Sequence, residues 1–136
     1  MQLNPSLLFD GNCDEAFKFY AKALGGKILF RITYGESPMA KETSKELLDK
    51  VMHIRLEASG NILMGSDAPC DRYSKPQGFF VTLGVETPEE AERIFNALSE
   101  KGTVGMPLQE TFWAQRFAMF VDQFGTPWMI NCEKKP

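Results

Sequence analysis

Three polar side chains that could take part in chemistry alternate with apolar residues in one short segment of the chain. His53, Arg55 and Glu57 interleave with apolar residues between positions 51 and 58. Successive side chains of a strand point to opposite faces, so these three would share one face while their apolar neighbours pack on helices. Imidazole exchanges protons near neutral pH, and a carboxylate on the same face could act as a base or fix the imidazole tautomer.

This pattern supports two interpretations. In the first, His53 and Glu57 are catalytic acid/base groups and Arg55 binds a ligand. In the second, a single histidine beside an arginine and a glutamate is an ordinary hydrogen-bonded residue on a strand face. The sequence leaves both open.

A second group combines an aromatic ring with a guanidinium. Trp113 lies in a segment that follows Pro107, and Arg116 comes three residues later. Such a pair could stack on and clamp a planar or anionic small molecule, so both are candidate ligand-binding residues. Ordinary packing of Phe112 and Trp113 against the rest of the fold is the alternative.

We expect structural roles for the other residues whose side chains could take part in chemistry. Asp67 and Tyr73 lie near the middle of the chain, where a loop cap interaction competes with ligand contact. We interpret the methionines as core side chains that fill gaps, and Trp128 as a core residue. Three widely spaced cysteines predict reduced structural thiols; they are Cys13, Cys70 and Cys132. The sequence has no Gly-rich phosphate loop, nucleophile elbow, HExxH or paired CxxC motif.

The elements that position these residues occur twice. Two amphipathic helices with acidic first turns are predicted from about 13 and from about 88, each after an apolar run and before strand-like segments. We expect Asn12 with Glu15 to form a capping box on the first helix, and Thr87 with Glu90 on the second. Because neither copy can bury its apolar face alone, we expect any site at or between the halves.

Strand propensity and alternation predict the remaining elements. We expect strands at 3–9, 27–34, 51–58, 62–66, 79–85, 115–121 and 127–132. The charged segment 36–50 is expected to be a mobile insert with a short helix near 45–49.

Composition sets the class of protein. The 136 residues carry a formal charge of −3, with lysines and arginines scattered along the chain. This excludes the basic patch of a nucleic-acid or anionic-membrane binder. The N-terminal segment lacks a basic signal-peptide region and no apolar run could span a bilayer, so we expect a cytoplasmic location.

Several motifs resemble one known family. They are 9–16 (FDGNCDEA), 52–56 (MHIRL), 107–113 (PLQETFW) and 122–128 (DQFGTPW). They are similar to the PhnB-like branch of the vicinal oxygen chelate superfamily, which includes glyoxalase I and bleomycin-resistance proteins. The resemblance implies an α+β fold, with two βαβββ modules forming a cupped mixed sheet that holds a ligand. We expect a single domain, 1–136, with modules at 1–68 and 78–136.

The resemblance also implies where a metal would be held, on the first and last strands of each module. Those positions carry apolar, thioether, hydroxyl or amide groups instead of imidazole or carboxylate; they are 7–9, 63–65, 80–82 and 129–131. We therefore expect no metal site and no cofactor, with a divalent metal in the cup as the alternative. Some sequences of this branch are labelled ubiquinone-biosynthesis methyltransferases, but this chain lacks the Gly-rich turn that would hold S-adenosylmethionine.

Together these observations predict a small-molecule binding protein with its ligand in the cup. The alternative is an enzyme of lyase, isomerase or oxygenase type. It would act on a small oxygenated substrate through His53 and Glu57, or through an unrecognised divalent metal. By resemblance we also expect a homodimer.

Overall fold

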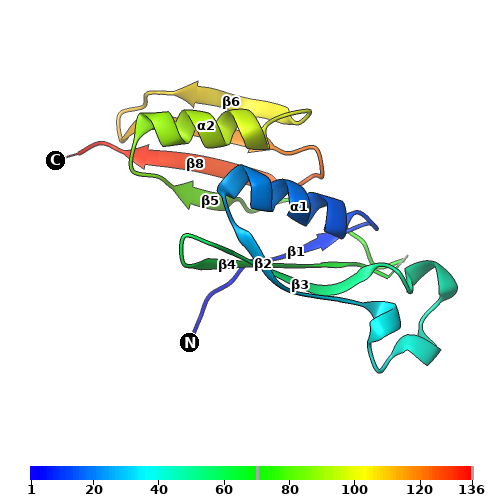
Figure 1. Ribbon diagram of the computed structural model, residues 1–136. Helices are drawn as coiled ribbons and strands as arrows, with labels where there is room; N and C mark the ends of the chain where they lie inside the picture. Colours follow the sequence, from blue (N-terminus) through cyan, green and yellow to red (C-terminus); the bar gives the residue numbers. More distant parts are fainter. Residues whose placement is uncertain (70, 136) are drawn as a thin grey trace. The chain divides into compact units, whose positions relative to one another are not determined.

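The computed structural model describes residues 1–69 and 71–135, and it divides the chain into two compact units, Met1–Ser74 and Lys75–Pro136. Each unit combines one α-helix with a four-stranded sheet of mixed direction (Figure 1). The predicted α+β class and the repeated order of elements are therefore confirmed. No helix within the described residues is long and apolar enough to cross a membrane.

The first unit runs strand, helix and three strands, with short 3-10 turns between the second and third strands. Its sheet has the order β1-β4-β3-β2, in which β1 pairs parallel to β4 and the other neighbours are antiparallel. The elements are β1 (Ser6–Phe9), α1 (Cys13–Leu24), β2 (Lys27–Thr33), β3 (Val51–Ala58) and β4 (Asn61–Asp67). Ser59 and Gly60 both have positive φ, as a tight turn between β3 and β4 requires.

The second unit repeats this topology with the sheet order β5-β8-β7-β6, and β5 is parallel to β8. Its elements are β5 (Val81–Gly84), α2 (Pro88–Leu98), β6 (Thr103–Gln109), β7 (Ala114–Val121) and β8 (Pro127–Glu133). β5 is shorter than the strand predicted at 79–85. Phe79 and Phe80 lie outside it, and both are exposed. In both units the strand that comes first in sequence is an edge strand joined to the last.

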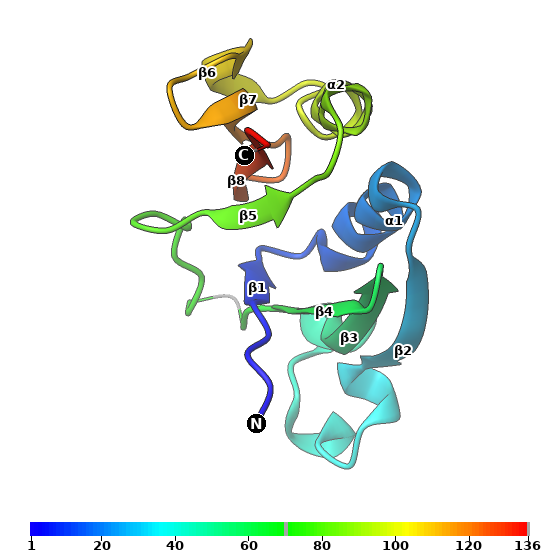
Figure 2. The same cartoon turned by 90° about the vertical axis from the view of Figure 1, so that its left-hand side faces the viewer.

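Each helix packs on one face of its own sheet and leaves the other face free of helix (Figure 2). The buried face of α1 includes Phe17 and Tyr20, which are fully buried with Ile54 and Leu56 of β3. Gly25 ends α1 in the left-handed conformation, which glycine adopts without steric cost. In the second unit the rings of Phe95 and Phe120 meet edge to face, with centroids 5.5 Å apart.

The two helix N-termini differ from each other. Thr87 Oγ1 accepts a hydrogen bond from the Glu90 amide at 3.1 Å, so the predicted threonine cap of α2 is confirmed. The predicted Asn12 cap of α1 is wrong, because the Asn12 side chain makes no capping hydrogen bond. The Cys13 amide donates instead to the carboxylate of Asp67, which arrives from the end of β4.

The insert between β2 and β3 contains three 3-10 turns, η1 (Tyr34–Glu36), η2 (Ala40–Glu42) and η3 (Lys45–Leu47). The last of these corresponds to the short helix predicted near 45–49. Leu47 is buried, which fixes this turn on the first unit. At the start of the insert, Thr33 and Glu36 form a reciprocal capping box.

Candidate small-molecule binding faces

The helix-free face of the first sheet presents the three polar residues of β3. Ile54 and Leu56 are fully buried on the helix side, and His53, Arg55 and Glu57 alternate with them and are half-buried. Strand register extends this face across the sheet, because Arg55 pairs with Phe30 of β2 and with Met64 of β4. We call His53, Arg55, Glu57, Phe30 and Met64 the polar face.

His53 and Glu57 are held by different neighbours on this face. The His53 ring lies 6.0 Å from the Phe30 ring, centroid to centroid. Glu57 Oε1 accepts a hydrogen bond of 2.8 Å from the Gly60 amide in the β3–β4 turn. Four residues of strand separate their Cα atoms by about 13 Å, so Glu57 is too far away to orient the imidazole directly. Their catalytic roles stay predictions.

Arg55 is distinctive because one of its donors has no partner. Its Nε atom is buried, and among residues 1–69 and 71–135 nothing accepts a hydrogen bond from it. A buried donor without an acceptor costs roughly 1–3 kcal/mol, so such groups are rare in folded proteins and call for an explanation. The nearby carboxylate of Glu57 does not supply the acceptor, because it is directed to the turn.

The helix-free face of the second sheet is built around Trp113. Its indole Nε1 donates to Asn131 Oδ1 at 3.2 Å, and its ring lies against Phe117 with centroids 5.1 Å apart at 70°. Phe112 packs on it edge to face at 4.8 Å. These contacts hold Trp113 in one orientation while it remains 43% exposed. Asn131 and Phe117 were not among the predicted site residues, although they pair directly across β8 and β7.

A row of thioethers lies beside this tryptophan. Register pairs Met106 with Met119, Met119 with Met129, and Met129 with Thr82, so the row crosses all four strands. Thr82 Oγ1 donates to the Met129 sulfur at 3.7 Å. The core interpretation is wrong for these three methionines, which are half-buried, because Met119 alternates with the buried Ala118 and Phe120 of β7. We call this row with Trp113, Phe117 and Asn131 the thioether face.

Arg116 does not join Trp113 on this face. It pairs with Cys132, which is fully buried, whereas its neighbour Phe117 pairs with Asn131 on the thioether face. Arg116 is exposed, and its Nη1 donates to the carbonyl of Gln115 at 2.7 Å. The predicted role of Arg116 in ligand binding stays a prediction. Trp128 is fully buried, which confirms its predicted place in the core.

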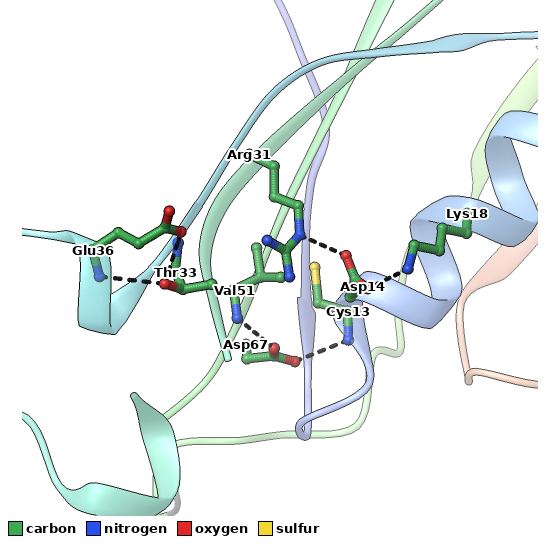
Figure 3. Close-up of polar contacts among 8 residues, drawn as sticks. All are labelled: Cys13, Asp14, Lys18, Arg31, Thr33, Glu36, Val51 and Asp67. Carbon is green, nitrogen blue, oxygen red and sulfur yellow. Dashed lines mark hydrogen bonds and ion pairs between the residues drawn. The ribbon is translucent and has the colours of Figure 1, made fainter. Parts of the chain in front are cut away.

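Asp67 organises the polar centre of the first unit (Figure 3). Its Oδ1 accepts from the amides of Gly11 and Cys13, both at 3.0 Å, and its Oδ2 accepts from the Val51 amide at 2.9 Å. Its backbone carbonyl accepts from the Tyr34 hydroxyl at 2.8 Å. The predicted loop-cap interaction of Asp67 is therefore confirmed, and its carboxylate is fully committed to the backbone.

This buried carboxylate affects its neighbours. Burial raises the pKa of the Cys13 thiol, and the nearby charges of Asp67 and Asp14 raise it further. Burial and the Asp67 charge also raise the pKa of Tyr34. A buried thiol with a raised pKa is a poor nucleophile, so Cys13 is structural.

An ion-pair group lies at the surface beside this centre, also visible in Figure 3. The carboxylate of Asp14 contacts Lys18 Nζ at 2.9 Å and Arg31 Nε at 2.6 Å. Desolvation would raise the pKa of Asp14, but hydrogen bonds from Lys18 and Arg31 outweigh it and hold the pKa below its usual value. This group ties α1 to β2.

Comparison with known proteins places this geometry in a family. The sequence profile of the Glyoxalase/Bleomycin resistance protein/Dioxygenase superfamily matches residues 2–130. The chain therefore belongs to this superfamily, as its motifs predicted. Protein YjdN of Escherichia coli (strain K12) is 36% identical over 143 residues, an alignment that covers 99% of this chain and 97% of YjdN.

Solved structures share the fold over the whole chain. Protein PA1353 from Pseudomonas aeruginosa is 44% identical with a TM-score of 0.91, and 99% of each chain is covered. A PhnB protein from Bacillus cereus, described as a putative 3-demethylubiquinone-9 3-methyltransferase, is 22% identical with a TM-score of 0.80 over 97% of this chain and 99% of that one. At that identity the second likeness shows the fold alone. The present chain has two mixed sheets, which differ from the doubly wound parallel sheet of a dinucleotide-type fold.

The residues of this chain do not fit the divalent metal that the superfamily implies. Register places Leu8, Met64, Thr82 and Met129 on the helix-free faces of the four strands concerned. Zn²⁺ prefers imidazole, thiolate or carboxylate ligands in sets of three or four, and Mg²⁺ prefers carboxylate oxygens; these four side chains offer none of those groups. Within the described part of the chain, no three His, Cys, Asp or Glu residues gather where they could hold a metal ion.

Proposed function

We propose that this chain is a small-molecule binding protein whose ligand lies on the helix-free sheet face and is held without the superfamily metal. One observation carries the proposal. Trp113 is fixed by Asn131 and Phe117 and still exposes 43% of its surface. Aromatic side chains that are both oriented and exposed supply contact area at a small entropic cost.

The chemistry of the thioether face suggests the kind of ligand. Thioether side chains are polarizable and adapt their shape, so they accommodate flat apolar groups of different outline. An indole ring beside them offers an edge or a face for stacking. The proposed ligand is therefore a planar, mainly apolar compound whose ring contacts Trp113 and the row of methionines.

Fluorine NMR of protein labelled with 5-fluorotryptophan would test this proposal, because the chain has two tryptophans in different environments. Trp128 is fully buried, so its resonance is an internal control. The probes would be uncharged planar aromatic compounds, beginning with quinoline, and Trp113→Phe would assign the signals. We expect saturable shifts of the Trp113 resonance with little movement of Trp128. If no compound at about 1 mM moves the Trp113 signal or raises the melting temperature, the proposal is wrong.

We further propose a homodimer, which membership of the superfamily supports. One chain has a mass of 15.3 kDa. Light scattering at micromolar concentration should therefore give twice that mass. A single species with the mass of one chain would contradict the dimer and would leave ligand binding to be judged by the NMR experiment.

A further inference from the structure

The unpartnered Arg55 donor leads to an inference about the first unit. It does not depend on the thioether face, which belongs to the second unit. The buried Nε is on the central part of the first sheet, since β3 lies between β4 and β2. A guanidinium presents its Nε and one Nη side by side, which matches two oxygens of a carboxylate or phosphate. Nε has no partner among the described residues, and because neighbouring protein atoms cover it, a ligand oxygen would reach it only once the Arg55 side chain or those atoms shift.

The neighbours of Arg55 define what else such a ligand would meet. Phe30, which is 48% exposed, and Met64 are its direct cross-strand partners. They place one apolar side chain on each strand that neighbours Arg55. The only acid on the polar face within the described residues is Glu57, and the Gly60 amide holds that carboxylate at the turn. An incoming anion would therefore meet a cation that no carboxylate already neutralises.

We infer that the polar face binds an anionic small molecule, with its carboxylate or phosphate group on Arg55 and its apolar part against Phe30. The ligand oxygen would supply the acceptor that Nε lacks, and this acceptor is worth more to the bound state than an ordinary surface contact because Nε is already removed from water. The contribution of Arg55 is a directional pair of donors, which lysine cannot reproduce.

The Nε–H signals of arginine can be followed individually by ¹⁵N NMR, which gives a direct test. The chain has five arginines, Arg31, Arg55, Arg72, Arg93 and Arg116, and the spectrum of Arg55→Lys identifies the Arg55 signal by its loss. Benzoate, inorganic phosphate and uncharged benzyl alcohol would be titrated at constant ionic strength. We expect a saturable shift of the Arg55 signal with benzoate, phosphate or both, and none with benzyl alcohol.

Three variants separate binding from structure. Arg55→Lys keeps the charge and should weaken anion affinity at least tenfold, whereas Arg93→Lys, at an exposed site on α2, should leave it unchanged. Arg55→Met removes the unpaired donor, so it should melt no lower than the wild type and lose the anion-dependent rise in melting temperature. A shift with benzoate alone identifies a carboxylate ligand, and a shift with phosphate alone identifies a phosphate ligand.

Three results would overturn the inference. The first is an Arg55 signal that neither anion moves. The second is anion affinity that survives Arg55→Lys, which would place the anion elsewhere. The third is a lowered melting temperature of Arg55→Met with no anion effect on the wild type, which would make Arg55 a structural residue only.

Discussion

Replacing Asp67 by asparagine should destabilise the first unit strongly, although the change removes only one charge and almost no volume. The carboxylate is completely buried and accepts three backbone hydrogen bonds, two on Oδ1 and one on Oδ2. Asparagine can keep its oxygen toward Gly11 and Cys13, but its amide group then faces the Val51 amide, and two donors meet. One charge-assisted bond, worth roughly 1.5–3 kcal/mol, is lost and a buried donor is left unpaired, so we expect a loss of about 2–4 kcal/mol.

Urea unfolding at neutral pH would measure this loss. Both tryptophans, Trp113 and Trp128, lie in the second unit, so fluorescence reports that unit, while circular dichroism at 222 nm reports the helices of both. If the units unfold in separate transitions, the transition seen only by circular dichroism should move to lower urea. The slope of free energy against urea should stay unchanged.

Asp14→Asn is the matched control. Like Asp67→Asn, it removes one negative charge near the N-terminus of α1. Its carboxylate is 32% exposed and makes surface ion pairs, which typically contribute less than about 1 kcal/mol. The reasoning about Asp67 would be refuted if Asp67→Asn cost no more free energy of unfolding than Asp14→Asn.

Three further outcomes can be checked with the same purified protein. Gly65→Ala should cost roughly 1–3 kcal/mol in urea unfolding, because a Cβ there would collide with the Phe17 ring, whereas Gly84→Ala, where a Cβ meets nothing within 4 Å, serves as its control. The pKa of Asp14 is lowered in the folded state, so its contribution is present above the unfolded value near 3.9 and is lost as the pH falls through the folded value. The stability difference between wild type and Asp14→Asn should therefore shrink as pH is lowered from about 6 toward 3, and a difference that grew would contradict it. Iodoacetamide at pH 7.5 should leave Cys13 unmodified in peptide mass spectra until urea unfolds the protein, and rapid native labelling would show that the thiol is accessible.

The sequence pattern predicted the elements and faces that depend on local periodicity. The alternation of 51–58 predicted β3 and the shared face of His53, Arg55 and Glu57, because a strand has a period of two and one of its faces is buried. The threonine cap of α2 was predictable because Thr87 and Glu90 are three residues apart.

Local sequence patterns could not predict the interactions between distant segments. The α1 cap was assigned to Asn12 because the capping residue is usually local, but Asp67, 54 residues from Cys13, supplies the acceptor. The Trp113–Asn131 bond and the placement of Arg116 depend on the register of β7 against β8, including an irregularity between Ala114 and Arg116. A strand irregularity shifts which side chains share a face, and the sequence contains no clear signal for it.

The parallel pairing of β1 with β4 has a consequence for how the chain folds during its synthesis. β1 leaves the ribosome before the other strands of its unit, but its partner β4 ends at Asp67, about 60 residues later. At a synthesis rate of roughly 5–20 residues per second, the apolar β1 remains unpaired for about 3 to 12 seconds before β4 is available. Asp67, the last residue of β4, also accepts hydrogen bonds from the amides of Gly11, Cys13 and Val51. The first unit can thus close its sheet and satisfy its buried amides in a single late step, before the second unit is complete.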